Sequence, residues 1–306
     1  MEPALVISNY KIPPPLKQGD TIGVCAPSGA FDISRFNIGI DVLKSMGFNL
    51  HIPDAIYQQK RYMAGDDRER ADVINSLFQN TNIKGIICAR GGFGALRTLD
   101  YIDYELIAAN PKLFVGFSDI TALLIAIYEN SKLQVVHGPV VTSLADTNES
   151  TLKSLYNQLT SSYYSDLNNT FSQDSNSSNR LFCSKCRALR KGYASGRLTG
   201  GNLTTLCHLI GTKFQPNFDD SILFLEDVGE PPYKIDRMLT QMKLTGIFRG
   251  VKGIIIGSIS QPPSVIDEIL QEIFDNPEQP IILGFDSGHG KTNLSLRFAS
   301  TVEISF

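Results

Sequence analysis

Apolar residues fall into two alternating patterns along the first half of the chain. Short continuous apolar runs end at polar or glycine-rich turns. Between them apolar residues recur every three to four positions, as in a helix that packs on one face. The predicted strands cover residues 21–26, 48–52, 85–89, 113–115 and 134–137, and the predicted helices cover residues 35–46, 67–79, 95–102 and 120–129. Because the strands are continuous apolar runs, the pattern predicts a parallel sheet covered by helices on both faces.

The second half of the chain has a different pattern. A glycine-rich turn over residues 196–202 precedes a mixture of shorter elements. The predicted helices cover residues 203–210 and 233–245, and the predicted strands cover residues 222–227, 253–258, 280–285 and 298–304. These elements predict a smaller α+β domain.

A segment rich in serine and asparagine separates the two patterns. Residues 160–180 contain few large apolar residues, which predicts a mobile surface segment between two domains. We therefore expect a first domain over residues 1–160, a linker over 161–180 and a second domain over 181–306.

Four turns follow the predicted strands of the first half and carry chemically active residues. They are Pro27-Ser28-Gly29, Arg90-Gly91-Gly92-Phe93-Gly94, the turn at Ser118 and the segment that begins at His137. Ligands of open α/β sheets bind outside the carboxyl ends of the strands. We therefore expect these turns to converge on one site.

Composition and charge narrow the class of protein. The 306 residues include 42% hydrophobic and 19% charged residues, and the net charge is −3. This balance is typical of a globular protein and predicts no nucleic-acid partner and no attraction to an anionic membrane. No apolar run approaches the ~20 residues that span a bilayer, and the N-terminal residues do not match a secretory signal.

The cysteines give a further indication of location. Five are scattered along the chain, and the odd number favours reduced thiols and a cytoplasmic location. Cys183 and Cys186 have the spacing of a zinc pair, but no second pair of cysteines or histidines lies near them. We therefore expect no metal site.

Ser118 lies where a strand meets a helix. Gly116 breaks the apolar run at 113–115, and the helical pattern begins at Ile120. A tight turn there exposes a serine hydroxyl beside the free N–H groups of a helix start, which suits a nucleophile. The alternative is that Ser118 or Asp119 only caps the helix. These residues alone favour the cap, because Ile120 stands where the G-x-S-x-G pattern has its second glycine.

The chain has four histidines from which a general base can be sought. His51 and His208 fit structural positions better than catalytic ones, and His137 is expected to hydrogen-bond behind the site. His289 lies between two glycines after a predicted strand, where the backbone can bring an imidazole close to another group. His289 is therefore the candidate base.

A catalytic histidine needs a group that fixes its tautomer, and an acidic turn offers three candidates. Glu226 closes a buried apolar strand and is the leading one, while Asp227 and Glu230 compete with it. A salt bridge or a turn cap is the structural alternative for Glu226. The order Ser118, Glu226, His289 is that of a hydrolase triad with serine first and histidine last.

Other chemistries fit the sequence less well. The Arg90–Gly94 turn resembles a phosphate cradle, but it does not match G-x-x-x-x-G-K-[ST], and no G-x-G-x-x-G follows the first strand. The sequence therefore predicts no nucleotide cofactor. A non-catalytic α/β protein that holds a small anion on its glycine-rich turns remains an alternative.

Several short motifs occur together in one order along nearly the whole chain. They are Val24-Cys25-Ala26-Pro27-Ser28-Gly29, Ala89-Arg90-Gly91-Gly92-Phe93-Gly94, Gly116-Phe117-Ser118-Asp119-Ile120-Thr121, His137-Gly138-Pro139, Gly200-Gly201-Asn202-Leu203, Leu225-Glu226-Asp227-Val228-Gly229-Glu230-Pro231-Pro232-Tyr233, Asp236-Arg237 and Gly288-His289-Gly290. With these motifs the chain resembles the LD-carboxypeptidases, or murein tetrapeptide carboxypeptidases. These are serine peptidases whose relatives include the microcin C self-immunity proteins.

The resemblance implies a fold and an activity. It implies a flavodoxin-like N-terminal domain, akin to class I glutamine amidotransferases, and a smaller swivelling β/β/α C-terminal domain with the site between them. The implied reaction removes the terminal D-alanine from muropeptides during cytoplasmic cell-wall recycling, without a metal or cofactor, in a homodimer. The microcin branch, which hydrolyses amides of peptide–nucleotides, is the alternative, and the lack of tryptophan weakly disfavours it.

The resemblance also implies roles for single residues. Ser118 corresponds to the nucleophile, Glu226 to the residue that orients the base, and His289 to the base. Backbone N–H groups of Asp119 and of the Gly91-Gly92 turn correspond to the oxyanion hole. On sequence grounds Arg90 is the candidate that binds the substrate's terminal carboxylate, with a structural salt bridge as its alternative. After His289 the chain has Ser295-Leu296-Arg297 where the family often has a Pro-Leu-Gly type segment.

Overall fold

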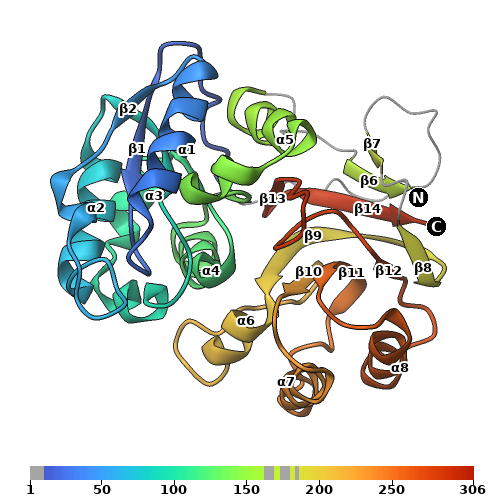
Figure 1. The fold of residues 1–306 in the computed structure, drawn as a ribbon. Helices are drawn as coiled ribbons and strands as arrows, with labels where there is room; N and C mark the ends of the chain where they lie inside the picture. Colours follow the sequence, from blue (N-terminus) through green and yellow to red (C-terminus); the bar gives the residue numbers. More distant parts are fainter. Residues whose placement is uncertain (1–9, 162–168, 173–179, 183–185) are drawn as a thin grey trace.

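Two β-sheets form the framework of the computed structural model, which describes residues 10–161, 169–172, 180–182 and 186–306. Figure 1 shows the sheet of the first half at the left and the sheet of the second half at the right. Each sheet has helices packed against it, and most strand pairs are parallel. The expected α/β class is thereby confirmed, while the expected domain limits stay a prediction.

The first sheet has six strands in the order β13-β5-β4-β3-β1-β2. Its strands are β1 (Thr21–Cys25), β2 (Asn49–His51), β3 (Ile83–Cys88), β4 (Leu113–Gly116), β5 (Val135–His137) and β13 (Leu296–Phe298). Its helices are α1 (Ile33–Ser45), α2 (Asp67–Gln79), α3 (Tyr104–Ala109), α4 (Thr121–Ser131) and α5 (Glu149–Thr160). Short 3₁₀ segments are η1 (Asp54–Tyr57), η2 (Ala95–Tyr101), η3 (Ser118–Ile120) and η4 (Val141–Asp146). Strand β13 comes from the end of the chain and pairs antiparallel with β5.

The second sheet has eight strands in the order β7-β6-β14-β9-β10-β11-β12-β8. Its strands are β6 (Asn169–Ser172), β7 (Arg180–Phe182), β8 (Arg187–Arg190), β9 (Tyr193–Asn202), β10 (Ser221–Asp227), β11 (Val251–Ile259), β12 (Ile281–Leu283) and β14 (Thr301–Ser305). Its helices are α6 (Leu203–Leu209), α7 (Pro232–Leu244) and α8 (Pro263–Ile273). Strands β9 to β12 run parallel, so their carboxyl ends meet at one edge.

Helix α4 connects the cores of the two sheets. Nearly all of its side chains are buried, which is typical of a helix with no solvent-facing side. It packs on β4 and β5 of the first sheet and on β9 and α6 of the second half. Because η3 and α4 directly follow β4, the turn at Ser118 lies where the two halves of the molecule meet.

Three sequence-based expectations about elements are wrong. The glycine-rich segment at 196–202 is the end of strand β9, not a turn, and the helix expected at 95–102 is the 3₁₀ segment Ala95–Tyr101 rather than an α-helix. The expected closing strand at 298–304 is two strands in different sheets, because Ala299 turns the chain with φ 67°. In the expected linker, the described residues include strand β6 and the first residue of β7.

The cysteines differ in part from the expectation of reduced thiols. Cys25, Cys88 and Cys207 are free and buried. Cys186 is disulfide-bonded, which corrects the expectation at that position, while Cys183 lies outside the described residues.

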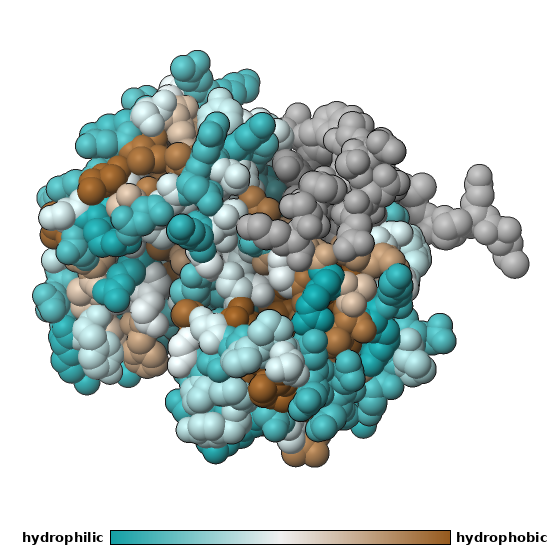
Figure 2. Space-filling view, turned by 45° about the vertical axis from the view of Figure 1, so that its right-hand side comes forward, coloured by the Kyte–Doolittle hydropathy of each residue, from teal (hydrophilic) through white to brown (hydrophobic). Residues whose placement is uncertain are grey.

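The surface is mainly polar in the space-filling view. Figure 2 shows hydrophilic residues over most of this face, with hydrophobic residues in small separate patches. Within the described residues, no helix is long and apolar enough to cross a membrane.

Candidate active site

Ser118 sits in a strained turn at the carboxyl end of β4. Its φ of 64° lies in the left-handed region, which non-glycine residues rarely adopt and which often marks a functional residue. Gly116 permits this turn, because a Cβ there would lie 2.5 Å from a methyl carbon of Ile120. The turn therefore has the first glycine of the G-x-S-x-G pattern, Gly116, while Ile120 occupies the position of the second.

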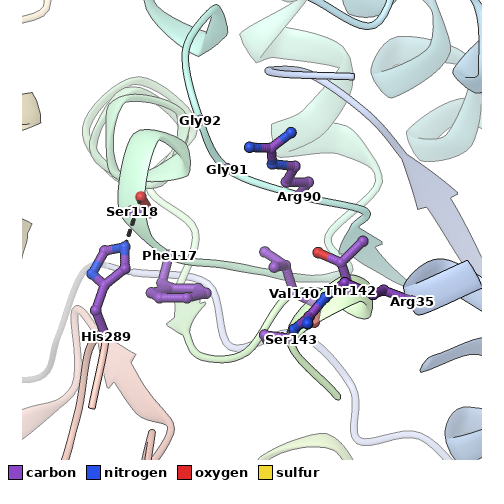
Figure 3. A pocket seen from close by; sticks show the side chains of 10 residues that line it. All are labelled: Arg35, Arg90, Gly91, Gly92, Phe117, Ser118, Val140, Thr142, Ser143 and His289. Atoms are coloured by element: carbon purple, nitrogen blue, oxygen red, sulfur yellow. Dashed lines mark hydrogen bonds between the residues drawn. The ribbon is translucent and has the colours of Figure 1, made fainter. Parts of the chain in front are cut away.

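Three side chains from distant parts of the sequence form a hydrogen-bonded chain. The Nε2 atom of His289 lies 3.1 Å from the Ser118 hydroxyl, and its Nδ1 atom lies 2.7 Å from Oε2 of Glu226 (Figure 3 shows the first contact). Glu226 is the next-to-last residue of strand β10 and is fully buried. A Cβ on Gly288 would lie 2.5 Å from that same carboxylate oxygen, so a glycine beside His289 is needed for the close approach.

The surroundings of His289 raise its pKa. Burial lowers the pKa of His289, but its hydrogen bond to the Glu226 carboxylate and the negative charges of Glu226 and Asp227 raise it and together outweigh burial. The imidazolium form is thus stabilised, as it must be in a histidine that takes a proton from a nucleophile. A serine whose hydroxyl meets an imidazole held by a buried carboxylate has the geometry of an activated nucleophile.

The other acidic candidates make different contacts. Asp227 accepts hydrogen bonds from the backbone N–H and hydroxyl of Thr204 at the start of α6, at 2.9 and 2.8 Å. Glu230 pairs with Lys234 at 2.9 Å, one turn along the same segment. Glu226 is therefore the member of the acidic turn that holds His289.

The remaining histidines lie outside this chain of contacts. His51 and His208 are exposed. His137 is fully buried beside the rings of Phe117, Phe224 and Phe298, and burial lowers its pKa to about 3. Within the described residues neither of its ring nitrogens has a hydrogen-bond partner, so the expected hydrogen-bonding role is wrong. An apolar aromatic pocket, rather than a polar one, surrounds this imidazole.

A pocket of about 360 Å³ opens beside Ser118. Its described lining residues are Arg35, Arg90, Gly91, Gly92, Phe117, Ser118, Val140, Thr142, Ser143 and His289. Figure 3 shows Ser118 and His289 at one end, Arg90 near the Gly91-Gly92 loop and Arg35 beyond Thr142 and Ser143. These residues include two guanidinium groups and no carboxylate, so the pocket suits an anionic ligand.

Of the predicted oxyanion and carboxylate-binding residues, Gly91, Gly92 and Arg90 line this pocket, and Asp119 directly follows the lining residue Ser118. A Cβ on Gly91 would lie 2.9 Å from the Cβ of Ser118, and Gly92 has φ 101°. The backbone N–H of Asp119 is near the start of η3, where N–H groups have no partner within the helix. The Arg90 guanidinium donates to the carbonyl of Ala30 and retains further donors.

Arg35 is a pocket residue that sequence reasoning missed. It lies in the first turn of α1 and pairs with Asp146 of η4. The order of the elements could have indicated Arg35, because the helix that follows β1 begins at the same sheet edge as the turn at Ser118. A basic residue in that first turn was therefore a candidate for the site.

Among the described residues, no group of three or more histidine, cysteine or acidic side chains is arranged to hold a metal ion. The site is instead built from a hydroxyl, an imidazole, a carboxylate and backbone N–H groups. Such a set supports nucleophilic and general-base chemistry.

Known proteins and solved structures are similar to this chain over nearly its whole length. A probable murein peptide carboxypeptidase of Bacillus subtilis (strain 168) is 33% identical over 298 residues, covering 94% of this chain and 89% of that protein. The microcin C7 self-immunity protein MccF of Escherichia coli is 31% identical, covering 99% of this chain and 95% of that protein. The crystal structure of an MccF-like protein from Bacillus anthracis (strain Ames) is similar with a TM-score of 0.85 and 29% identity. That match covers 96% of this chain and 95% of that one.

Family models match both halves of the chain. The model of the LD-carboxypeptidase N-terminal domain matches residues 22–138, and the model of the LD-carboxypeptidase C-terminal domain matches residues 195–304. Ser118 lies in the first match, and Glu226 and His289 lie in the second. The chain therefore belongs to the LD-carboxypeptidase family, peptidase S66, and is a peptidase.

Proposed function

We propose that this chain is a serine-type LD-carboxypeptidase that removes the terminal D-alanine from murein tetrapeptides in cytoplasmic cell-wall recycling. The observation that supports it is the contact of His289 with both the Ser118 hydroxyl, at 3.1 Å, and the buried Glu226 carboxylate, at 2.7 Å. The murein substrate is proposed from the name of the Bacillus subtilis relative. We further propose a homodimer, as in the resembled family.

The chemistry follows from these contacts. His289 accepts the proton of Ser118 as the serine oxygen attacks the carbonyl carbon between the L-centre and D-alanine. Backbone N–H groups of Asp119 and the Gly91-Gly92 turn stabilise the oxyanion, and a donor of this type contributes about 3–4 kcal/mol. The C–N bond then breaks, and the D-alanine amine takes the proton from His289. Water, deprotonated by His289, attacks the acyl-enzyme and releases Ser118.

A carboxypeptidase must also recognise a free terminal carboxylate. Arg90 follows strand β3 and lines the pocket beside the Gly91-Gly92 turn, close to the predicted position of the scissile bond. Its planar guanidinium matches a carboxylate with two parallel hydrogen bonds. We assign this role to Arg90, and Arg35 adds a second positive charge to the same pocket.

The test is product analysis of a defined murein tetrapeptide by mass spectrometry. The wild-type protein should release D-alanine and leave the tripeptide, whereas Ser118→Ala should release none while remaining folded. Ser45→Ala, at an exposed serine of α1, is the matched control and should be fully active. Full activity of Ser118→Ala would refute the proposal.

A second candidate is hydrolysis of the amide bond in a peptide–nucleotide, as in the microcin branch. Its support is the 31% identity to the microcin C7 self-immunity protein over nearly the whole chain. The same nucleophile and base would act in both reactions. Competition between a murein tetrapeptide and an aminoacyl sulfamoyl nucleoside separates the candidates, because the preferred substrate has the higher kcat/KM.

A further inference from the structure

A buried carboxylate lies directly behind the nucleophile. The Asp119 side chain is 8% exposed and points away from solvent, although its backbone belongs to the turn at Ser118. Its Oδ2 atom accepts hydrogen bonds from the Ser28 hydroxyl at 2.6 Å and from the backbone N–H of Ala95 at 2.8 Å. One oxygen atom thus joins three segments that are distant in the sequence.

A buried arginine joins two of the same segments from the other side. Arg70 is 3% exposed, and its Nη1 atom donates to the carbonyl of Gly94 at 2.9 Å and to that of Pro27. Its Nη2 atom pairs with Asp67 at 2.6 Å. Burial of both the carboxylate and the guanidinium is costly unless their hydrogen bonds are made, so this network resists displacement.

The three joined segments are those that surround the Ser118 hydroxyl. They are the 27–29 turn, the 90–95 loop and the 118–119 turn. The first two are further linked by a hydrogen bond of 3.1 Å from the Gly29 N–H to the Gly91 carbonyl. The Asp119 carboxylate thus contacts Ser28 and Ala95, which lie in the two segments that flank the Gly91-Gly92 backbone.

We propose that the Asp119 side chain is a positioning residue that holds the Gly91-Gly92 N–H groups at the correct place to stabilise the oxyanion formed on attack by Ser118. Asp119 therefore acts twice, through its backbone N–H at the oxyanion and through its carboxylate on the opposite loop. This inference rests on the proposed serine mechanism. Donor placement within a fraction of an ångström decides how well an oxyanion is stabilised, so loosening this loop slows the chemical step more than it weakens substrate binding.

The test compares Asp119→Ala and Ser28→Ala with the wild-type protein, using any substrate that the wild type cleaves. Removal of one oxyanion donor costs about 10²–10³-fold in kcat. We expect Asp119→Ala to lower kcat by about 10²-fold and Ser28→Ala by about 10-fold, since Ala95 still binds the carboxylate. KM should change by less than about 3-fold in both, because uniform binding is retained.

A second readout separates positioning from a loss of folding. A peptide boronic acid forms a tetrahedral adduct with a serine nucleophile, so its Ki should rise in proportion to the fall in kcat/KM. The affinity of the intact peptide, measured by calorimetry in a Ser118→Ala background, should not change with Asp119→Ala. Asp103→Ala removes a helix cap outside the described pocket lining and serves as the matched control for lost stability. It should leave kcat and Ki unchanged.

The outcomes are distinguishable. If folded Asp119→Ala keeps its kcat within 2-fold, or if only KM rises, Asp119 has no positioning role, whatever the fate of the serine mechanism. If Ser118→Ala retains full activity, the serine mechanism itself fails. If Asp119→Ala lowers kcat but the boronic acid binds as tightly as to the wild type, the carboxylate does not act on the oxyanion and the inference is overturned.

Discussion

The backbone of Ser118 is held in a conformation that costs about 1–2 kcal/mol for a residue with a side chain. Two glycines permit it. Gly116 leaves room for Ile120, and Gly91 leaves room for Ser118 itself. With this packing on both sides, the Ser118 hydroxyl lies within hydrogen-bond reach of His289, which is the geometry that proton transfer requires.

The raised pKa of His289 predicts the pH dependence of the reaction. His289 must be neutral to accept a proton, and its pKa lies above the ordinary 6.5, so kcat/KM should rise with pH through a point above 6.5. In Asp227→Asn one negative charge near His289 is lost, while a side-chain oxygen remains to cap α6. The acid limb should then move to lower pH. Profiles of kcat/KM against pH for the wild type and for Asp227→Asn measure the position of the acid limb in each. The same position in both proteins would show that Asp227 does not act on His289.

Arg90 is expected to recognise the terminal carboxylate of the substrate. Because a charged hydrogen bond contributes about 1.5–3 kcal/mol, Arg90→Ala should lower kcat/KM for the peptide acid by about 10–100-fold. The peptide with a C-terminal amide should be a poor substrate for the wild type and should lose little more in the variant. Equal losses for the acid and the amide would indicate a structural role for Arg90 instead.

Residues beside a strand end could be predicted from the sequence, but their conformation and long-range partners could not. The strand, glycine and helix pattern predicts the turn at Ser118. The positive φ depends on contacts from Gly91, 27 positions away, and the pocket position of Arg35 depends on how α1 packs. The sequence could not show whether Glu226 or Asp227 contacts His289, because that depends on the direction in which each side chain leaves β10.

Strand β9 connects the second sheet to helix α4, which follows the turn at Ser118. The backbone N–H of Asn202 donates to the Thr121 hydroxyl at 3.1 Å, and a Cβ on Gly201 would lie 2.6 Å from the Thr121 side chain. Gly200 is equally constrained, because a Cβ there would lie 1.9 Å from the Phe224 carbonyl oxygen. The two glycines are needed for close packing of β9 rather than for a turn.

Gly201→Ala is expected to lower both stability and activity. Its φ of 130° and the close approach to Thr121 leave no space for a methyl group, so α4 and the adjoining turn at Ser118 must shift. We expect a destabilisation of about 1–3 kcal/mol and a lower kcat. Gly211→Ala is the matched control, because Gly211 also has positive φ but no atom within 4 Å of the added Cβ. Thermal unfolding and kcat of both variants test this, and equal behaviour would contradict it.

At the scale of elements, locally determined structure was predictable and long-range pairing was not. The apolar strands and the amphipathic helices α1, α2 and α7 follow from periodicity alone. The extended conformation of β9 contradicts its local glycine content, because pairing with β10 and β14 outweighs it. Strands β13 and β14 read as one strand, since the turn at Ala299 has no glycine or proline to mark it.

The whole molecule brings the three residues of the proposed triad together from two sheets. Ser118 follows a strand of the first sheet, and Glu226 lies at the carboxyl end of a strand of the second, one residue before its end. His289 lies between β12 of the second sheet and β13 of the first, so the chain returns to the first sheet soon after the proposed base. Figure 1 shows β13 reaching from the C-terminal part to the edge of the first sheet. Neither sheet alone contains the complete site.

At this scale the α/β class and the family could be predicted from the order of strands, helices and motifs. The interlocking of the two sheets could not, because the exchange of β13 depends on a pairing between residues about 160 positions apart. The contact between α4 and the second half has the same origin. Both depend on tertiary packing, which local patterns do not encode.

The central claim is that Ser118 is a nucleophile activated by His289 from the other half of the chain. Intact-protein and peptide mass spectrometry after treatment with a fluorophosphonate tests it most directly. We expect a single adduct on Ser118, formed much more slowly in His289→Ala and absent in Ser118→Ala. An adduct on another serine, or unimpaired labelling of His289→Ala, would contradict the claim.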